Sequence, residues 1–202
     1  MIPPDASDAI TTEITRRPLL HNRSRKHAGL GRSQTFCMVN KRSKPPDYSS
    51  LSRDRPYLYK LRLDFAESHL PSFKYNAITI NQNYQCSRHK DKGNGGESLL
   101  VGWGDYIGGE ISVEMGKATV QHDIKYQPLV LDFSKHYHWV TPFTGNRYSL
   151  VFYTCKIPHG VDLPPPSVMI VNGKHVFYRG DVPQRYDKYR FSAAYKLTQQ
   201  HM

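Results

Sequence analysis

The sequence predicts a mainly β protein with flanking helices (α+β), whose core is a double-stranded β-helix, or jelly roll. Short runs rich in β-branched and aromatic residues follow one another from residue 75 to residue 155, and turns containing glycine or proline separate them. Residues 110–114 alternate strictly between polar and apolar side chains, as a half-buried strand does. The chain has 202 residues, which allows one domain with a two-sheet core and extensions. In a jelly roll, side chains on separate strands converge at one open mouth.

The first 55 residues are expected to form a basic, largely flexible arm. They are rich in Arg, Lys, Ser and Pro, with basic clusters at residues 23–27 and 41–46. Their low apolar content predicts little core, although residues 35–39 could form an edge strand. The clusters could bind nucleic acid or act as a nuclear localisation signal. A solvated tail without either role is an equally good interpretation.

Residues 56–157 are expected to form the core domain. Apolar residues recur at helical spacing between Pro56 and Pro71, which predicts a structural helix that covers one side of a sheet. The strands are predicted in the segments 75–86, 98–104, 110–114, 119–122, 129–133 and 150–153.

Residues 158–202 are expected to add a hairpin and a basic, aromatic extension that packs on the core. The dipeptide Asn172-Gly173 separates two β-rich runs, which predicts a hairpin over residues 168–178. From residue 185 onward, aromatic residues are interleaved with Lys and Arg. Such a tail could stack on a nucleic-acid strand and neutralise it. It could equally be a helix that packs its aromatic side chains on the sheet.

The clearest chemical signal comes from His89 and Asp91. They are two positions apart, so both side chains leave the same face of an extended backbone. One imidazole and one carboxylate are two of the three ligands in a 2-His-1-carboxylate facial triad, which suits non-haem Fe(II). The third ligand must come from a distant strand, and His136 and His138 are both placed to supply it. This tripeptide pattern is also common by chance, and a lone histidine is more often a surface or core residue.

A fixed cation follows on the next predicted strand. A guanidinium at Arg147 and a hydroxyl at Ser149, on the same face, could hold the far carboxylate of a dicarboxylic acid through a bidentate contact. The order of His-x-Asp, then His, then Arg-x-Ser, with glycine-rich turns between them, favours an iron site over a chance match.

With these residues the chain resembles the Fe(II)/2-oxoglutarate dioxygenase superfamily. The similar stretches are residues 78–81, 88–94, 98–110 and 138–149, within a region that runs from about residue 75 to residue 155. The resemblance is closest to the TET/JBP branch, whose members oxidise the methyl groups of pyrimidine bases in nucleic acid. It implies Fe(II) as the metal, 2-oxoglutarate as the cosubstrate and O2 as the oxidant.

The resemblance also implies the metal ligands. His89 and Asp91 match the proximal iron ligands, and His138 matches the distal ligand by its spacing to the Pro-Phe turn and to Arg147. His136 lies on the same side of an extended strand as His138 and is the alternative distal ligand.

The remaining site residues surround the expected cosubstrate. Arg147 matches the residue that pairs with the C5 carboxylate of 2-oxoglutarate, and Ser149 is its expected helper. Asn94 falls where the pattern HxDxxN of the TET-like branch places a polar residue that faces the target base. Asn81 and Tyr84 could bond the carboxylates of 2-oxoglutarate, or could be ordinary strand-end residues.

The charge and the cysteine content limit which partners and which cellular compartment are expected. Lys and Arg number 28 against 17 Asp and Glu, a net charge of +11 that favours nucleic acid or another polyanion as partner. The 3 cysteines are too few and too scattered for a disulfide framework, which favours a reducing, intracellular compartment. No apolar run approaches the roughly 20 residues of a membrane span, so no membrane partner is expected. The sequence does not predict the oligomeric state.

The predicted function is oxidation of a methylated pyrimidine base, 5-methylcytosine or thymine, flipped into the pocket. A protein side-chain hydroxylase with the same chemistry is the first alternative, because this fold serves both. A non-catalytic nucleic-acid-binding module on the same fold is the second.

Overall fold

The computed structural model describes residues 1–20, 31–41, 44–156, 167–171 and 174–178. The basic cluster at residues 23–27, the Asn172-Gly173 turn and the tail from residue 185 lie outside the described residues. No helix in the described part of the chain is both long enough and apolar enough to cross a membrane.

In chain order, the elements are η1 (Pro4–Ser7), α1 (Asp8–Arg16), β1 (Arg32–Lys41), β2 (Lys44–Tyr48), α2 (Ser50–Asp54), α3 (Pro56–His69), β3 (Ala77–Gln82), β4 (Ser98–Gly104), β5 (Ile107–Gly108), β6 (Ile111–Met115), β7 (Ala118–His122), β8 (Leu129–Leu131), β9 (His138–Val140), β10 (Phe143–Thr144), β11 (Arg147–Tyr153), β12 (Ser167–Val171) and β13 (Lys174–Tyr178).

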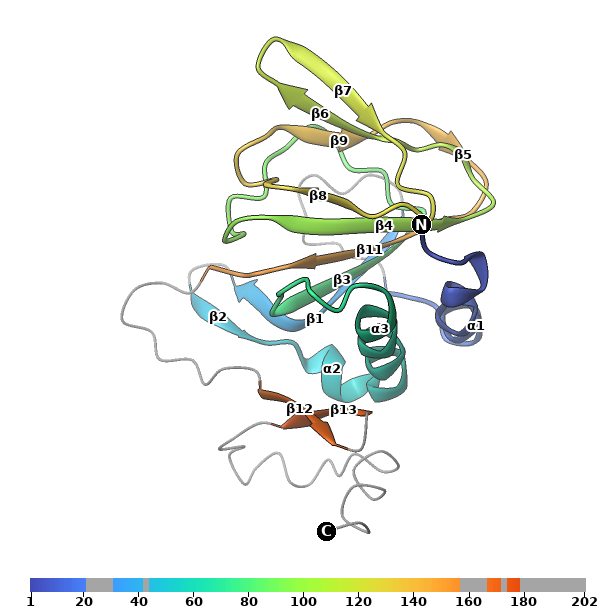
Figure 1. The fold of residues 1–202 in the computed structure, drawn as a ribbon, viewed down its shortest axis with the longest axis vertical. Helices are drawn as coiled ribbons and strands as arrows, with labels where there is room; N and C mark the ends of the chain where they lie inside the picture. Colours follow the sequence, from blue (N-terminus) through green and yellow to red (C-terminus); the bar gives the residue numbers. More distant parts are fainter. Residues whose placement is uncertain (21–30, 42–43, 157–166, 172–173, 179–202) are drawn as a thin grey trace.

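Two layers of antiparallel strands form the core. The larger sheet has six strands in the order β2-β1-β3-β11-β4-β8, and every neighbouring pair in it is antiparallel. The smaller layer consists of the sheet β7-β6-β9 and the short pair β10-β5. Figure 1 shows these strands on one side of the large sheet and helices α1 and α3 on its other side. This arrangement confirms the predicted double-stranded β-helix with flanking helices.

The two central strands of the large sheet, β3 and β11, separate an apolar face from a polar one. Side chains alternate along each strand, so every second residue faces the helices. On that face lie the fully buried residues Ile78, Ile80, Leu150 and Phe152. On the opposite face lie Thr79, Asn81 and Ser149, and the strand register pairs Asn81 with Ser149. The sheet thus carries its hydrophobic core on one side and presents polar groups to the other.

A second apolar cluster lies between the two layers, formed by Leu100, Ile111, Val113, Ile124, Phe133 and Val140. Burial of each such side chain contributes about 1.5–3 kcal/mol. The cluster holds the small layer against the large sheet and so fixes the position of β9, which carries His138.

Most predicted elements of the core domain are present. The helix expected between Pro56 and Pro71 is α3, with Pro56 in its first turn. The six predicted strand segments correspond to β3, β4, β6, β7, β8 and β11. The hairpin predicted over residues 168–178 is formed by β12 and β13, which pair in antiparallel register.

The sequence predicted a largely flexible N-terminal arm, but the described part of this region forms helices and strands. Ile10 and Ile14, one turn apart on α1, are 1% and 0% exposed and belong to the core under the large sheet. Strand β1 pairs with β3 from Arg32 to Cys37 and with β2 from Met38 to Lys41, so it is part of the large sheet along its length. The average composition of this region is polar, but its few apolar residues have the spacing that a helix and a strand need to bury them.

Candidate metal centre

The structure brings His89, Asp91 and His138 together at the open end of the two layers. His89 and Asp91 lie in the loop between β3 and β4, and His138 begins β9. The backbone N–H of His89 donates to the carbonyl of His138 over 3.0 Å, and the N–H of His138 donates back over 2.9 Å. The N–H of Asp91 donates to the carbonyl of Phe133 over 3.0 Å. These backbone bonds hold the loop against β9.

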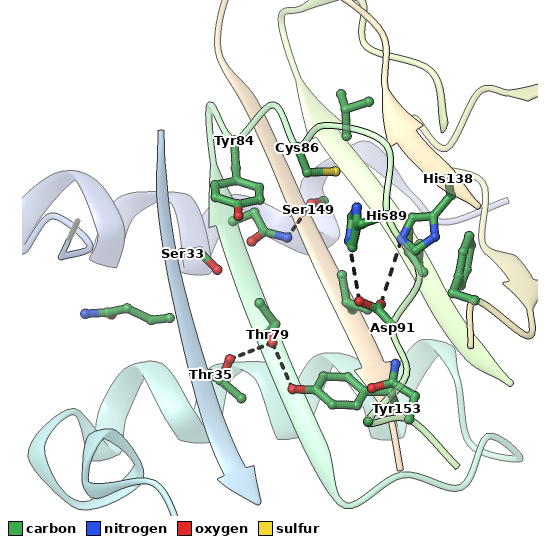
Figure 2. Close-up of a pocket in the computed structure, with 18 of the residues that line it drawn as sticks. Ser33, Thr35, Thr79, Tyr84, Cys86, His89, Asp91, His138, Ser149 and Tyr153 are labelled. Atoms are coloured by element: carbon green, nitrogen blue, oxygen red, sulfur yellow. Dashed lines mark hydrogen bonds and ion pairs between the residues drawn. The ribbon is translucent and has the colours of Figure 1, made fainter. Parts of the chain in front are cut away.

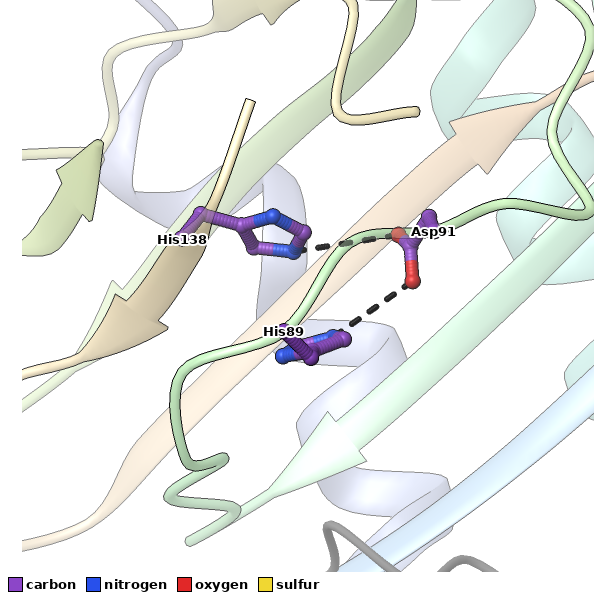
Figure 3. Close-up of side chains that lie close together, drawn as sticks. All are labelled: His89, Asp91 and His138. Carbon is purple, nitrogen blue, oxygen red and sulfur yellow. Dashed lines mark ion pairs between the residues drawn. The ribbon is translucent and has the colours of Figure 1, made fainter. Parts of the chain in front are cut away.

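The three side chains offer ligand atoms that all lie within 4.8 Å of one another. Nε2 of His89 is 3.4 Å from one carboxylate oxygen of Asp91, and Nε2 of His138 is 3.8 Å from the other. Figure 3 shows both imidazoles turned toward the same carboxylate. Two imidazole nitrogens and a carboxylate oxygen on one side of a shared point make up the donor set of a facial triad.

A hydrogen bond at Nδ1 orients each of the two imidazoles so that Nε2 faces the cluster. Nδ1 of His89 is 2.7 Å from the carbonyl of Ser87, and Nδ1 of His138 is 3.3 Å from the carbonyl of His136. In the neutral ring, an Nδ1–H that donates to a carbonyl leaves the lone pair on Nε2. Both Nε2 atoms can therefore serve as ligands.

His136 is not part of the cluster. Its Nδ1 faces the backbone carbonyl of Glu114 at 3.1 Å. Of the two histidines that the sequence left open, the geometry places His138 beside Asp91.

The two clustered imidazoles differ in proton affinity. Burial opposes the charged form of His89, but hydrogen bonds to Asp91 and Cys86 outweigh it and raise the pKa of His89 to about 10. Burial lowers the pKa of His138, and the attraction of Asp91 offsets this only in part. A negative carboxylate beside two basic nitrogens is thus an electrostatic environment that favours a cation.

The triad opens onto a cavity of about 880 Å³ between the two layers. This volume lies within the roughly 300–1,000 Å³ of small-molecule sites. The cavity contains all eight residues selected from the sequence, namely Asn81, Tyr84, His89, Asp91, Asn94, His138, Arg147 and Ser149. The structure thus brings together in one space residues that the sequence places on four separate segments.

Arg147 is a buried cation at one end of this cavity. Its side chain is 2% exposed, its Nε donates to the carbonyl of Gly109 over 3.0 Å, and one terminal nitrogen has no partner among the described residues. Burial lowers the pKa of Arg147, because it penalises the charged form. Gly109 has φ +75°, and a Cβ there would lie 2.9 Å from Cδ and Nε of Arg147. Only glycine therefore allows the guanidinium to lie in this position.

Asn81 and Ser149 lie beside Arg147 on the cavity face of the sheet. The amide nitrogen of Asn81 donates to the hydroxyl of Ser149 over 3.2 Å. The amide oxygen of Asn81 is buried and has no partner among the described residues. Tyr84 is 7% exposed and lines the same end. Charged and neutral hydrogen-bonding groups thus converge where a carboxylate could be held.

Asn94 has a different environment from the one expected. It lines the cavity, but its amide nitrogen donates to the hydroxyl of Ser98 over 3.1 Å, and its backbone N–H donates to the carbonyl of Asp91 over 2.9 Å. These bonds close the loop that carries Asp91 and tie it to β4. A contact of Asn94 with a substrate stays a prediction.

Several cavity residues were not predicted from the sequence, namely Ser33 and Thr35 on β1, Thr79 on β3, Cys86 in the loop and Tyr153 on β11. Thr79 could have been found, because it is two positions before Asn81 on one strand and so shares its face. Ser33 and Thr35 could not, because their position beside Asn81 and Thr79 follows only from the pairing of β1 with β3.

Comparison with known proteins gives only remote matches. No protein-family model and no curated protein matches the chain. An oxidoreductase of the 2OG-Fe(II) oxygenase family from Burkholderia pseudomallei is 19% identical, with a TM-score of 0.49 over 73% of this chain and 77% of that one. A Pseudomonas putida prolyl-4-hydroxylase is 17% identical, with a TM-score of 0.48 over 77% and 89%. NgTET1 in complex with 5mC DNA is 15% identical, with a TM-score of 0.49 over 77% and 69%. At this level of similarity we take neither activity nor substrate from these structures.

Proposed function

We propose that the chain is an Fe(II)/2-oxoglutarate-dependent dioxygenase that hydroxylates a methylated pyrimidine base, 5-methylcytosine or thymine, in nucleic acid. The observation that carries the proposal is that one cavity holds both a His-Asp-His ligand cluster and the buried guanidinium of Arg147, which has a nitrogen without a partner among the described residues.

The ligand set fits Fe(II). Ca²⁺ and Mg²⁺ prefer an all-oxygen shell, which His89 and His138 do not offer. Two imidazoles and one carboxylate on one face suit non-haem Fe(II), because they leave positions toward the cavity for a cosubstrate and O2. Zn²⁺ is also bound by three such ligands in hydrolases. Arg147 favours the oxygenase, because a buried cation in the same cavity indicates an anionic cosubstrate.

The position of Arg147 fits one end of 2-oxoglutarate. Burying a guanidinium without an anion is costly, and a carboxylate that accepts two hydrogen bonds would offset that cost. Ser149 lies beside it, and its hydroxyl can donate to the same carboxylate. The unpartnered amide oxygen of Asn81 can reach that carboxylate through a bridging water, which donates to both. The other end of the molecule would face the metal held by His89, Asp91 and His138. When bound, the metal and the cosubstrate supply the oxidation of a C–H bond by O2, and the protein supplies geometry and exclusion of water.

Charge around the metal loop supports nucleic acid as the substrate. Lys90 and Lys92 flank Asp91 and line the cavity, and Lys156 donates to the carbonyl of Lys92 over 3.4 Å. None of these three lysines forms an ion pair with an acidic side chain in the described part of the chain. Together with the net charge of +11, they supply the positive rim that a phosphate backbone needs. A base can reach a metal inside the cavity only after it flips out of the base stack. The cavity is large enough to admit one base.

The test is turnover of a defined substrate. The purified chain is incubated with Fe(II), 2-oxoglutarate and air, with single-stranded or duplex oligonucleotides that contain one 5-methylcytosine or thymine. Succinate and oxidised nucleosides are measured by mass spectrometry. We expect both products, and we expect them to be lost in His138→Gln and kept in the matched variant His136→Gln. Succinate without an oxidised nucleoside, together with oxygen gained by added peptides, would contradict the nucleic-acid substrate and leave the oxygenase. Absence of 2-oxoglutarate turnover and binding would contradict both.

A further inference from the structure

The cavity has a second polar end that the metal and the cosubstrate do not use. Arg147 is the first residue of β11 and Tyr153 is the last. At roughly 3.3 Å per residue they are about 20 Å apart along the strand. A five-carbon dicarboxylate is only about 6 Å long, with carbon–carbon bonds of about 1.5 Å. A cosubstrate held at Arg147 therefore leaves the Tyr153 end of the cavity open.

Hydroxyl groups line this second end. The side-chain oxygens of Thr35 and Thr79 are 2.8 Å apart, and the oxygen of Thr79 is 3.4 Å from the hydroxyl of Tyr153. Figure 2 shows these three groups close together, below Tyr84 in the view. They come from three adjacent strands, because the register places Thr35 opposite Thr79, and Thr79 opposite Val151, two residues before Tyr153. We call Thr35, Thr79 and Tyr153, together with Ser33, the hydroxyl wall.

Ser33 extends the hydroxyl wall toward the middle of the cavity. It lies opposite Asn81 in the strand register and lines the cavity. Its side chain is 3% exposed, and its hydroxyl oxygen has no partner among the described residues. Buried polar groups are nearly always hydrogen bonded, so the hydroxyl of Ser33 points to a ligand or water at this place.

The chemistry of the hydroxyl wall differs from that of the cavity rim. Each hydroxyl both donates and accepts hydrogen bonds and carries no charge, so the wall suits a neutral group with donors and acceptors on one edge. The cations lie elsewhere. Arg147 is at the far end, the ammonium of Lys90 lies 4.6 Å from the ring centre of the exposed Tyr137, and Lys92 is exposed. A ligand that places a neutral polar ring against the hydroxyl wall and anionic groups near Lys90 and Lys92, the lysine rim, fits both regions.

We propose that the hydroxyl wall is the substrate-recognition site, and that Thr79 and Tyr153 hydrogen bond the polar edge of a pyrimidine base whose flanking phosphates lie at the lysine rim. This proposal rests on the proposed function and adds the residues that choose the substrate. Carbonyl and amino groups of a pyrimidine match the donors and acceptors of the hydroxyl wall, whereas an aliphatic side chain would leave the buried hydroxyl of Ser33 without a hydrogen-bond partner. Thr79 and Tyr153 are already bonded to each other, which fixes where their remaining donors and acceptors point.

The test separates the base from the phosphates. Thr79→Val keeps the shape of the side chain and removes the hydroxyl, and Tyr153→Phe does the same at the other position. Thr119→Val, at an exposed threonine of β7, is the matched control. Two probes are used, a single-stranded oligonucleotide with one 5-methylcytosine and the same oligonucleotide with an abasic site. Binding is measured by fluorescence anisotropy under argon with Fe(II) and 2-oxoglutarate, and 2-oxoglutarate affinity by calorimetry.

We expect Thr79→Val and Tyr153→Phe each to weaken binding of the methylcytosine probe on the order of tenfold. Affinity for the abasic probe and for 2-oxoglutarate should stay within about twofold of the unaltered chain, as should all values for Thr119→Val. Circular dichroism melting identifies a variant that fails to fold, in which case the other variant decides. Equal loss of 2-oxoglutarate affinity would overturn the proposal, because the hydroxyl wall would then hold the cosubstrate.

Two other outcomes are distinct. If the unaltered chain binds both probes equally, or if both variants leave all affinities unchanged, the base is not read by these residues and the proposal fails. If the chain does not bind 2-oxoglutarate, the proposed oxygenase fails instead. A preference for the methylcytosine probe that is lost in Thr79→Val would then still support the hydroxyl wall as a base site.

Discussion

Nε2 of His138 lies 3.8 Å from a carboxylate oxygen of Asp91, although one residue begins β9 and the other lies in the loop between β3 and β4. The backbone holds them there, because His89 and His138 exchange two hydrogen bonds and Asp91 donates to Phe133. The segments that carry the ligands are therefore held together by the backbone of the folded layers.

Replacement of His138 should abolish metal binding while replacement of His136 should not. His138→Gln removes a ligand, and we expect Fe(II) affinity to fall by more than the roughly 10–100-fold typical of a change outside the ligand shell. His136→Gln keeps the backbone carbonyl that accepts from His138, so the loss should be less than about threefold. Calorimetric titration of both variants with Fe(II) under argon measures this difference. Equal losses would show that the choice of His138 is wrong.

Arg147 should control the affinity for 2-oxoglutarate without supporting the ligand-free fold. Truncation of one partner of a buried charge pair costs about 2–5 kcal/mol, so Arg147→Gln should weaken 2-oxoglutarate binding at least 30-fold. Its own melting temperature should not fall, because the change also removes a buried cation with an unpartnered nitrogen. At a cosubstrate concentration about 100 times the dissociation constant of the unaltered chain, that chain should gain roughly 2.7 kcal/mol of stability, and Arg147→Gln no more than about 0.9 kcal/mol.

The matched control is Arg88→Gln, which removes an exposed arginine paired with Glu114. It should leave 2-oxoglutarate affinity unchanged. A melting temperature of Arg147→Gln that falls strongly, with cosubstrate affinity intact, would mean that the guanidinium is structural.

The site could be predicted from sequence where local spacing carries the chemistry. His89 and Asp91 share a face in any extended segment, and so do Arg147 and Ser149, so their pairing needed no tertiary information. The register and the order of strands could not be read in this way. That β3 lies between β1 and β11, which places Ser33, Asn81 and Ser149 in one row, follows only from the pairing of strands far apart in the chain.

The N-terminal region shows why composition misleads there. Its many charged and polar residues lower the average apolar content, yet a helix needs only one apolar stripe and a strand only one apolar face. Ile10 and Ile14 supply the stripe, and Phe36 supplies the face. For Asn94, the family pattern predicted a position at the site. It did not predict the hydrogen bonds of Asn94 to Ser98 and Asp91.

Gly109 should be needed for cosubstrate binding in a way that Gly116 is not. Both have positive φ, +75° and +66°, so alanine at either costs about 1–3 kcal/mol of backbone strain. At Gly109 the added carbon would also lie 2.9 Å from Arg147, whereas at Gly116 nothing lies within 4 Å. We expect both variants to lose comparable stability in chemical denaturation, and Gly109→Ala to lose 2-oxoglutarate affinity as well. Unchanged affinity in Gly109→Ala would show that the guanidinium position is not critical.

Asn94 should act on the metal through the loop that carries Asp91. Its amide bonds Ser98 and its backbone bonds the carbonyl of Asp91, so Asn94→Ala should lower Fe(II) affinity by about 10–100-fold, the range for a residue that positions a ligand. Ser98→Ala removes the same hydrogen bond from the other side and should have an effect in the same direction, although Ser98 is not among the residues that line the cavity. A residue that only contacts the base would instead raise the KM for the oligonucleotide and leave Fe(II) affinity unchanged in both variants. Calorimetric Fe(II) titration and oligonucleotide KM measured on the same two proteins distinguish these roles, because only the loop-positioning role links Asn94 and Ser98.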